Sequence, residues 1–183
     1  KISTDRYLFH DAFINLEGEL ILIVPVYMRA DTHFKQLKVF SKQCELRKIE
    51  SIEAVSYEPI VILKYKMLDS DNVTVVFGEQ RITMDLIRPT PVPDVKRLSL
   101  STLFKDDFKL FPLFYQYYTK QGVEDFFMYY NGHLTPEIRS TFNLPGVILL
   151  EWSYHYWNVN CNFRHHAQLT QMHHALYKYG KGL

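Results

Sequence analysis

Two short polar strings in the second half of the chain combine residue types that can hold a nucleotide. Lys105-Asp106-Asp107 follows one apolar segment, and Asn131-Gly132 follows the next. Backbone amides and a Lys can contact phosphate, while a carboxylate or an amide can hydrogen-bond to a ribose or a base. Each string also has a simpler interpretation, because Asp is a good helix N-cap and Asn-Gly is a common tight turn.

Two other groups of residues raise the question of a metal site. Asp69-Ser70-Asp71 is the only D-x-D string in the chain, and Mn²⁺ and Mg²⁺ prefer such carboxylate oxygens. Its place between two apolar strands predicts a solvent-exposed turn instead. His165, His166, His173 and His174 flank one helical segment. Zinc usually needs a His pair four residues apart or three convergent ligands, so we expect polar surface histidines.

An aromatic cluster and two glutamines complete the candidates. Gln168 and Gln171, on the same helical segment as the histidines, are candidates for hydrogen bonding to a ligand. The aromatic cluster surrounds His155 and consists of Trp152, Tyr154, Tyr156 and Trp157. These rings can stack on the C–H face of a sugar, or they can form a core or interface patch.

Residues 1–88 read as a β-rich segment in which apolar runs alternate with turn signals such as Asn15-Leu16-Glu17-Gly18. Strands are predicted at 6–14, 19–27, 35–40, 51–57, 60–67, 73–77 and 81–86, the last two as a hairpin. Residues 89–96 contain three prolines, which deny backbone donors and favour an extended connector. We therefore expect a domain boundary there.

The periodicity changes over residues 97–183. Strands at 97–103, 123–130 and 147–152 alternate with helices at 108–121, after Thr135 and at 164–179. This alternation predicts an α/β architecture with a parallel sheet and crossover helices. Ligands of such sheets bind beyond the carboxyl ends of the strands, so we expect the ligand site at residues 104–107, residues 131–133 and the 152–163 loop.

Composition sets the outer limits. The chain has 183 residues, 47% of them hydrophobic, which suits one large or two small folded domains. A net charge of +1 gives no global field that favours nucleic acid. Cys44 and Cys161 can form one bridge or remain two thiols. The chain begins at Lys1 without an initiator Met, and we expect it to be a fragment.

The second segment resembles a known enzyme family. LSLSTLFKDDFKLFPLFYQYYTKQGVEDFFMYYNG, residues 98–132, is similar to the opening of glycosyltransferase family 92 and related GT-A-type enzymes. There a strand ends in an NE-like charged turn and a later strand ends in YDN; here Lys105-Asp106-Asp107 and Tyr129-Tyr130-Asn131 stand in those places. VILLEW at 147–152 resembles the third strand of that family, and HAQLTQMHHALYKYG at 166–180 resembles its next helix. The chain departs from the family where Tyr130 replaces the Asp of YDN.

The resemblance implies a fold and a parent activity. It implies that residues 97–183 are the first half of a GT-A-like Rossmann-type βαβ unit, in an enzyme that moves a sugar from a nucleotide-sugar donor to a glycan or glycoprotein acceptor. It implies nucleotide contacts at Thr102, Lys105, Asp106 and Asn131, with Gln168 in support. It also implies a Mn²⁺ or Mg²⁺ ion in the full enzyme. The implied location is the secretory pathway or Golgi lumen, and the resemblance is compatible with a membrane-anchored parent protein.

The metal-binding D-x-D of the family would follow Leu183. We therefore expect these residues to bind no metal and to be inactive alone, with catalytic residues unassigned. A different hypothesis is a non-catalytic binding or structural module that keeps the glycosyltransferase-like fold. A third is an aromatic carbohydrate-binding surface on residues 1–95.

Overall fold

The structure is a computed structural model that describes residues 7–26, 32–53, 60–66, 70–86, 97–158 and 161–180. The side chains of residues 51–53, 157–158 and 161–166 lie outside this description. The chain forms two compact units. The first joins Lys1–Pro91 to Trp157–Leu183, and the second is Val92–Tyr156. The connector predicted at 89–96 lies outside the described residues.

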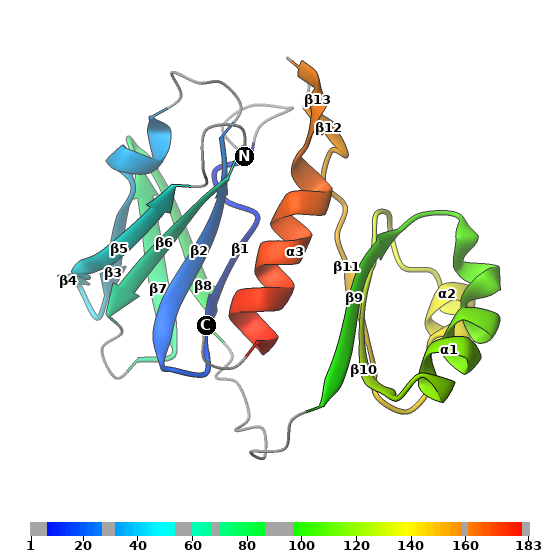
Figure 1. Ribbon diagram of the computed structural model, residues 1–183. Coiled ribbons are helices and arrows are strands. Elements are labelled where there is room, and N and C mark those ends of the chain that lie inside the picture. The colour runs from blue at the N-terminus through cyan, green and yellow to red at the C-terminus, as the bar shows by residue number, and fades with distance from the viewer. Residues whose placement is uncertain are drawn as a thin grey trace. The chain divides into compact units, whose positions relative to one another are not determined.

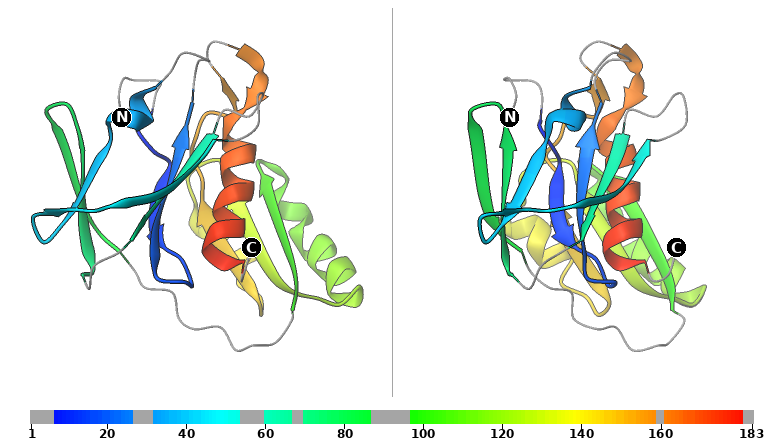
Figure 2. Two further views of the ribbon diagram at one scale, coloured as in Figure 1. Left: turned by 60° about the vertical axis from the view of Figure 1, so that its left-hand side comes forward. Right: turned by 90° about the vertical axis from the view of Figure 1, so that its left-hand side faces the viewer.

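The first unit is built on two antiparallel sheets (Figures 1 and 2). One sheet has the order β1-β2-β6-β5 and the other β4-β3-β7-β8. The strands are β1 (Asp11–Ile14), β2 (Glu19–Pro25), β3 (Lys38–Ser41), β4 (Cys44–Glu45), β5 (Lys48–Glu53), β6 (Ile60–Lys66), β7 (Asn72–Phe77) and β8 (Gln80–Asp85), with a 3₁₀ helix, η1, at His33–Gln36. The β-rich character and the β7–β8 hairpin are confirmed.

Three predicted strands of this unit begin several residues from where they were expected. The strand expected at 6–14 begins at Asp11. The strand expected from Lys35 begins at Lys38, because His33–Gln36 form η1 first. The strand expected at 51–57 begins at Lys48 and pairs with β6; residues 54–59 lie outside the described part. The exposed thiol of Cys44 is free, and the side chain of Cys161 is not described.

The long apolar run of β2 is explained by burial on both of its faces. Leu20, Leu22 and Val24 point into the core between the two sheets, while Ile21 and Ile23 belong to a second cluster on the outer face. All five are fully buried. A strand covered on both faces reads as continuous apolar sequence rather than as alternation.

Helix α3 (His166–Tyr179) covers that outer face (Figure 1). Leu169 and Tyr177 pack on the cluster formed by β1, β2 and β6. The predicted helix is therefore present, but it belongs to the first unit rather than to the 97–183 segment in which we expected it. The physical reason is the apolar outer face of the sheet, which needs a cover. Two short strands, β12 (Trp157–Asn158) and β13 (Cys161–His165), precede α3 as an antiparallel pair.

The second unit is a three-stranded sheet of order β11-β10-β9, in which both pairings are parallel. Its strands are β9 (Leu98–Phe104), β10 (Val123–Tyr130) and β11 (Val147–Glu151). Helices α1 (Phe111–Lys120) and α2 (Pro136–Thr141) connect them and cover one face (Figure 1). The predicted parallel sheet with crossover helices is confirmed, and the molecule is mixed α/β.

Local sequence sets the ends of these helices. The first crossover begins as a 3₁₀ helix, η2 (Asp107–Leu110), and becomes α-helical only at Phe111. Pro112 fits the first α-helical turn because its missing N–H has no intrahelical partner there. Gly122 ends the crossover with φ +90°. Thr135 caps α2 by accepting a hydrogen bond from the backbone N of Ile138.

Candidate functional site

The candidate site is the carboxyl edge of the β9–β10–β11 sheet. Tyr130, the last residue of β10, pairs with Phe104 at the end of β9 and with Glu151 at the end of β11. The three loops that follow therefore leave the sheet at one edge. This register brings Lys105 and Asp106 to the same edge as Asn131, as the sequence predicted.

The turn after β9 has an unusual backbone. Asp106 has φ +63°, in the left-handed region that few residues other than Gly adopt, and the N of Asp107 donates to the O of Lys105 at 2.7 Å. Asp106 precedes η2, but its carboxylate makes no capping hydrogen bond. Lys105 and Asp106 are exposed, and neither side chain has a partner among the described residues. Both are therefore available to a ligand.

Asn131 joins all three strand ends. Its backbone N donates to the O of Phe104 at 2.9 Å. Its Nδ2 donates to the O of Trp152 and to the O of Tyr154, each at 2.8 Å. Both amide protons are engaged, so Oδ1 is the side-chain atom left for a ligand. Asn131 therefore links the loops after β10 and β11 by hydrogen bonds, and it is also a candidate contact to a ligand.

Tyr130, which stands where the resembled family has Asp, is a packing residue. It is 9% exposed, and its ring centroid lies 5.2 Å from that of Phe104. A Cβ added to Gly132 would lie 2.9 Å from Cε1 of Tyr130. The Asn131-Gly132 string is thus explained in part by packing, because only Gly leaves room for this ring.

Glu151 and His133 also lie at this edge. Sequence reasoning expected residues 131–133 here but gave His133 no role, and it missed Glu151. Oε2 of Glu151 accepts from the backbone N of Leu134 at 2.9 Å, and Oε1 lies 3.0 Å from Nδ1 of His133. The hydrogen bond from Leu134, followed by that from His133, lowers the pKa of Glu151 below its usual value. The signal available in the sequence was the one charged residue that ends the apolar run VILLE.

Thr102 and Gln168 are placed differently. Thr102 is half-buried within β9, two residues before its end, and its Oγ1 lies 3.5 Å from the O of Leu103. Strand alternation puts it on the helix-covered face with Leu100 and Phe104. Gln168 is exposed on α3 and belongs to the first unit.

The aromatic cluster is packed at least in part. Trp152 is 3% exposed, and its ring lies edge-on to Tyr129 at 5.3 Å and to Tyr154 at 4.9 Å. Tyr156 is half-buried, and the side chain of Trp157 is not described. The core interpretation therefore holds for Trp152.

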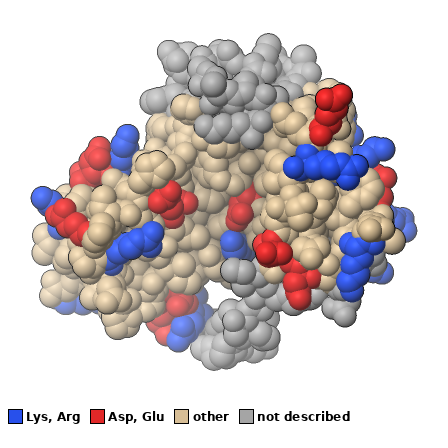
Figure 3. Space-filling view, turned by 180° about the vertical axis from the view of Figure 1, so that it is seen from behind, with Lys and Arg blue, Asp and Glu red and all other residues tan. Residues whose placement is uncertain are grey.

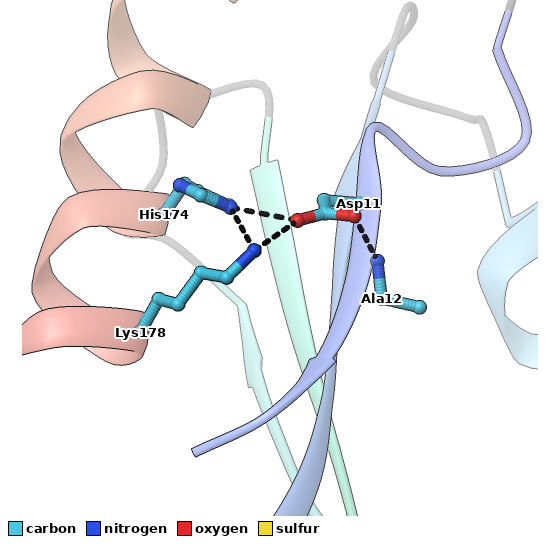
Figure 4. A network of polar contacts seen from close by, with 4 residues as sticks. All are labelled: Asp11, Ala12, His174 and Lys178. Atoms are coloured by element: carbon cyan, nitrogen blue, oxygen red, sulfur yellow. Dashed lines mark hydrogen bonds and ion pairs between the residues drawn. The ribbon is translucent and has the colours of Figure 1, made fainter. Parts of the chain in front are cut away.

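The expectation of surface histidines is wrong for His174, which is 1% exposed. Its Nε2 lies 2.7 Å from Oδ2 of Asp11 on β1, and Nζ of Lys178 lies 3.1 Å from the same oxygen (Figure 4). Burial lowers the pKa of His174, and the hydrogen bond to Asp11 offsets this only in part. His173 is half-buried, and the side chains of His165 and His166 lie outside the described residues.

Asp71 of the D-x-D string is exposed at the start of the β7–β8 hairpin, beside buried Ser70, whose Oγ donates to the O of Asn72 at 3.1 Å. Asp69 lies outside the described part of the chain. Among the residues that the structure describes, no three His, Cys, Asp or Glu side chains gather as a metal site would need. None of the described helices is long and apolar enough to cross a membrane.

One open depression lies beside α2 and β11 and contains none of the predicted residues. It is lined by Arg139, Ser140, Phe142, Asn143 and Leu149. Basic and acidic side chains are interspersed over the face shown in Figure 3, in keeping with the net charge of +1.

Comparison with known proteins gives no relative: no family model, curated protein or solved structure matches this chain. The class defined by the structure is thus mixed α/β, with antiparallel sheets in the first unit and a parallel sheet in the second. Function has to be argued from the residues at the carboxyl edge.

Proposed function

We propose that this chain is part of a glycosyltransferase that moves a sugar from a nucleotide-sugar donor to a glycan acceptor. The observation that carries the proposal is the register of β9, β10 and β11, whose carboxyl ends bring Lys105, Asp106 and Asn131 to one edge. Parallel α/β sheets bind ligands at that edge. The resemblance of residues 98–132 to glycosyltransferase family 92 supports the same assignment and the finer GT-A-like fold.

Each of these three residues is assigned a role from the side-chain atoms that make no hydrogen bond to the described residues. Lys105 supplies positive charge to a phosphate, and the carboxylate of Asp106 accepts from ribose hydroxyls. Oδ1 of Asn131 accepts from the base or the ribose. Thr102 stays in the proposal as a supporting contact. Gln168, for which the resemblance implies a supporting contact, belongs to the first unit and is given no role at this edge. The left-handed backbone of Asp106 fits this view, because strained residues gather at ligand sites.

The proposed reaction breaks the bond between the sugar and the diphosphate and forms a bond to an acceptor hydroxyl, so a nucleoside diphosphate leaves. A Mn²⁺ or Mg²⁺ ion in the full enzyme would offset the charge of that leaving group. The described residues form no group that would hold the ion. The 183 residues are proposed to bind the nucleotide, within an enzyme of the secretory pathway or Golgi lumen.

Thermal unfolding with a panel of nucleoside diphosphates, with and without Mn²⁺, tests the proposal. UDP or GDP should raise the unfolding temperature, and Lys105→Ala and Asp106→Ala should remove the rise. Lys109→Ala is the matched control, since Lys109 is an exposed Lys on the neighbouring η2. If no nucleotide shifts the wild-type protein, the assignment loses its main support.

The alternative is a non-catalytic binding or structural module. Two observations favour it: the amide protons of Asn131 are engaged by the carbonyls of Trp152 and Tyr154, and Tyr130 is packed where the family has an Asp. Turnover of any nucleotide-sugar by the 183 residues would exclude this module and would contradict the expected inactivity of the isolated chain.

A further inference from the structure

His133 and Glu151 form a pair that none of the predicted nucleotide contacts uses. They lie just beyond the end of β10 and at the end of β11, and Oε1 of Glu151 is 3.0 Å from Nδ1 of His133. The second carboxylate oxygen, Oε2, accepts from the backbone N of Leu134 at 2.9 Å. Both oxygens of Glu151 are therefore tied to the loop that begins at Asn131.

This arrangement selects one tautomer of His133. The pKa of Glu151 is lowered, first by the hydrogen bond from Leu134 and then by that from His133, so its carboxylate is ionised at neutral pH and can only accept. Nδ1 of His133 then carries the proton. Nε2 is the free atom of the ring, since the side chain is 89% exposed and no described residue bonds it.

We propose that Nε2 of His133 contacts a phosphate oxygen of the bound nucleoside diphosphate, with Glu151 as the positioning residue that aims the ring. This inference rests on the proposed function. His133 is two residues from Asn131, and Lys105 follows Phe104, the last residue of β9, which pairs with Tyr130 at the end of β10. Adjacent strands lie about 4.8 Å apart. Two groups able to carry positive charge thus follow the ends of two paired strands.

The charges around the pair suit an anionic ligand. With Nδ1–H donating to Glu151, a second proton on His133 lies at Nε2, and the imidazolium donates it to a phosphate oxygen as a charge-assisted hydrogen bond. Arg139 on α2 also acts on Glu151 through its positive charge. The charge of Glu151 is already engaged by Leu134 and His133, which limits its repulsion of a phosphate.

Binding measurements by titration calorimetry separate this role from a structural one. Wild type, His133→Gln and Glu151→Gln are each titrated with UDP and GDP, and with uridine and guanosine, which lack phosphate. His133→Gln should weaken binding of the diphosphates about tenfold, the usual size of one charge-assisted hydrogen bond at an exposed site, and leave the nucleosides unchanged. Lys120→Gln is the control, since Lys120 is exposed at the end of α1, just before the start of β10 and away from its carboxyl end.

The positioning role of Glu151 has its own readout. Nitrogen-15 spectra of the imidazole should show Nδ1 protonated in the wild type, and Glu151→Gln should lose that preference while binding UDP several-fold more weakly. Circular dichroism checks that each variant is folded.

The outcomes distinguish the inference from the proposed function. If Lys105→Ala weakens UDP and His133→Gln does not, the inference is overturned and the nucleotide site stands. If His133→Gln weakens nucleosides as much as diphosphates, the phosphate contact is overturned. If the wild type binds no nucleotide, both proposals fall together.

Discussion

Asp11 and His174 lie 163 residues apart in the chain, yet Oδ2 of Asp11 is 2.7 Å from Nε2 of His174. Lys178, one helical turn further, contacts the same oxygen at 3.1 Å, and the other oxygen accepts from the backbone N of Ala12 (Figure 4). Helix α3 is thus fastened to β1 by a largely buried polar network, in addition to the apolar contacts of Leu169 and Tyr177.

Replacing Asp11 by Asn should destabilise the first unit. The change removes the charge that Lys178 and His174 share, and a partner left unsatisfied costs on the order of 1–3 kcal/mol. We expect the lower half of that range, because the Asp11 side chain is 33% exposed. Urea unfolding followed by circular dichroism measures the loss. Asp85→Asn, at an exposed residue of β8, should be near neutral, and equal losses in the two variants would argue against the network.

Stability should fall as the pH drops below 6.5, the ordinary pKa of His174. Burial lowers the pKa of His174 in the fold, so the unfolded chain takes up a proton first and unfolding becomes easier as pH falls. The pKa of Asp11 is lowered too: burial raises it, but the hydrogen bond from His174 and the charge of Lys178 outweigh burial. Its contribution is present above 3.8 and is lost as pH falls through the lower folded pKa.

A pH series of unfolding free energies that runs from above 6.5 to below 3.8 checks this expectation. His174→Gln keeps a donor for Asp11 but cannot titrate, so it should flatten the upper part of the curve. His155→Gln should leave the curve unchanged, because that side chain is exposed. If the free energy of unfolding still declines steeply with falling pH in His174→Gln, a group other than His174 causes the decline.

Asn131→Ala should loosen the carboxyl edge even without a ligand. It removes both side-chain hydrogen bonds to the carbonyls of Trp152 and Tyr154, and two such bonds are worth roughly 1–3 kcal/mol. Hydrogen exchange of the loop after β11 should speed up along with the loss of stability. Asn143→Ala is the control, since Asn143 is exposed. Unchanged hydrogen exchange in Asn131→Ala would show that the side-chain hydrogen bonds of Asn131 contribute little to holding the loop after β11.

Gly146→Ala and Gly122→Ala form a matched pair. Both glycines have positive φ, +71° and +90°, so Ala at either site costs about 1–2 kcal/mol in backbone strain. A Cβ at Gly146 would also overlap the carbonyl oxygen of Glu124, whereas nothing lies within 4 Å of one at Gly122. Chemical denaturation should therefore show the larger loss for Gly146→Ala. Equal losses would mean that the backbone around Glu124 moves aside.

Much of the candidate site could be predicted from local sequence. Lys105 and Asn131 follow apolar runs separated by a helical pattern, and parallel pairing puts such residues at one edge. The roles of their atoms could not be predicted. The engagement of both amide protons of Asn131 depends on the carbonyls of a loop more than twenty residues away, and the Glu151–His133 pair depends on the same register.

The sequence by itself determined the hydrophobic periodicity of each element, and with it the β-rich first segment and the parallel second segment. The helix cap at Thr135 and the helix end at Gly122 also follow from neighbouring residues. Only the tertiary structure decided where α3 belongs. A helix of the right period can cover any apolar sheet face, and α3 covers the outer face of β1, β2 and β6, in the unit that begins the chain. Local patterns fix which residues are apolar or polar, whereas the partner of each face is set by long-range packing. For that reason His174 reads as a surface histidine in the sequence and is buried against Asp11 in the fold.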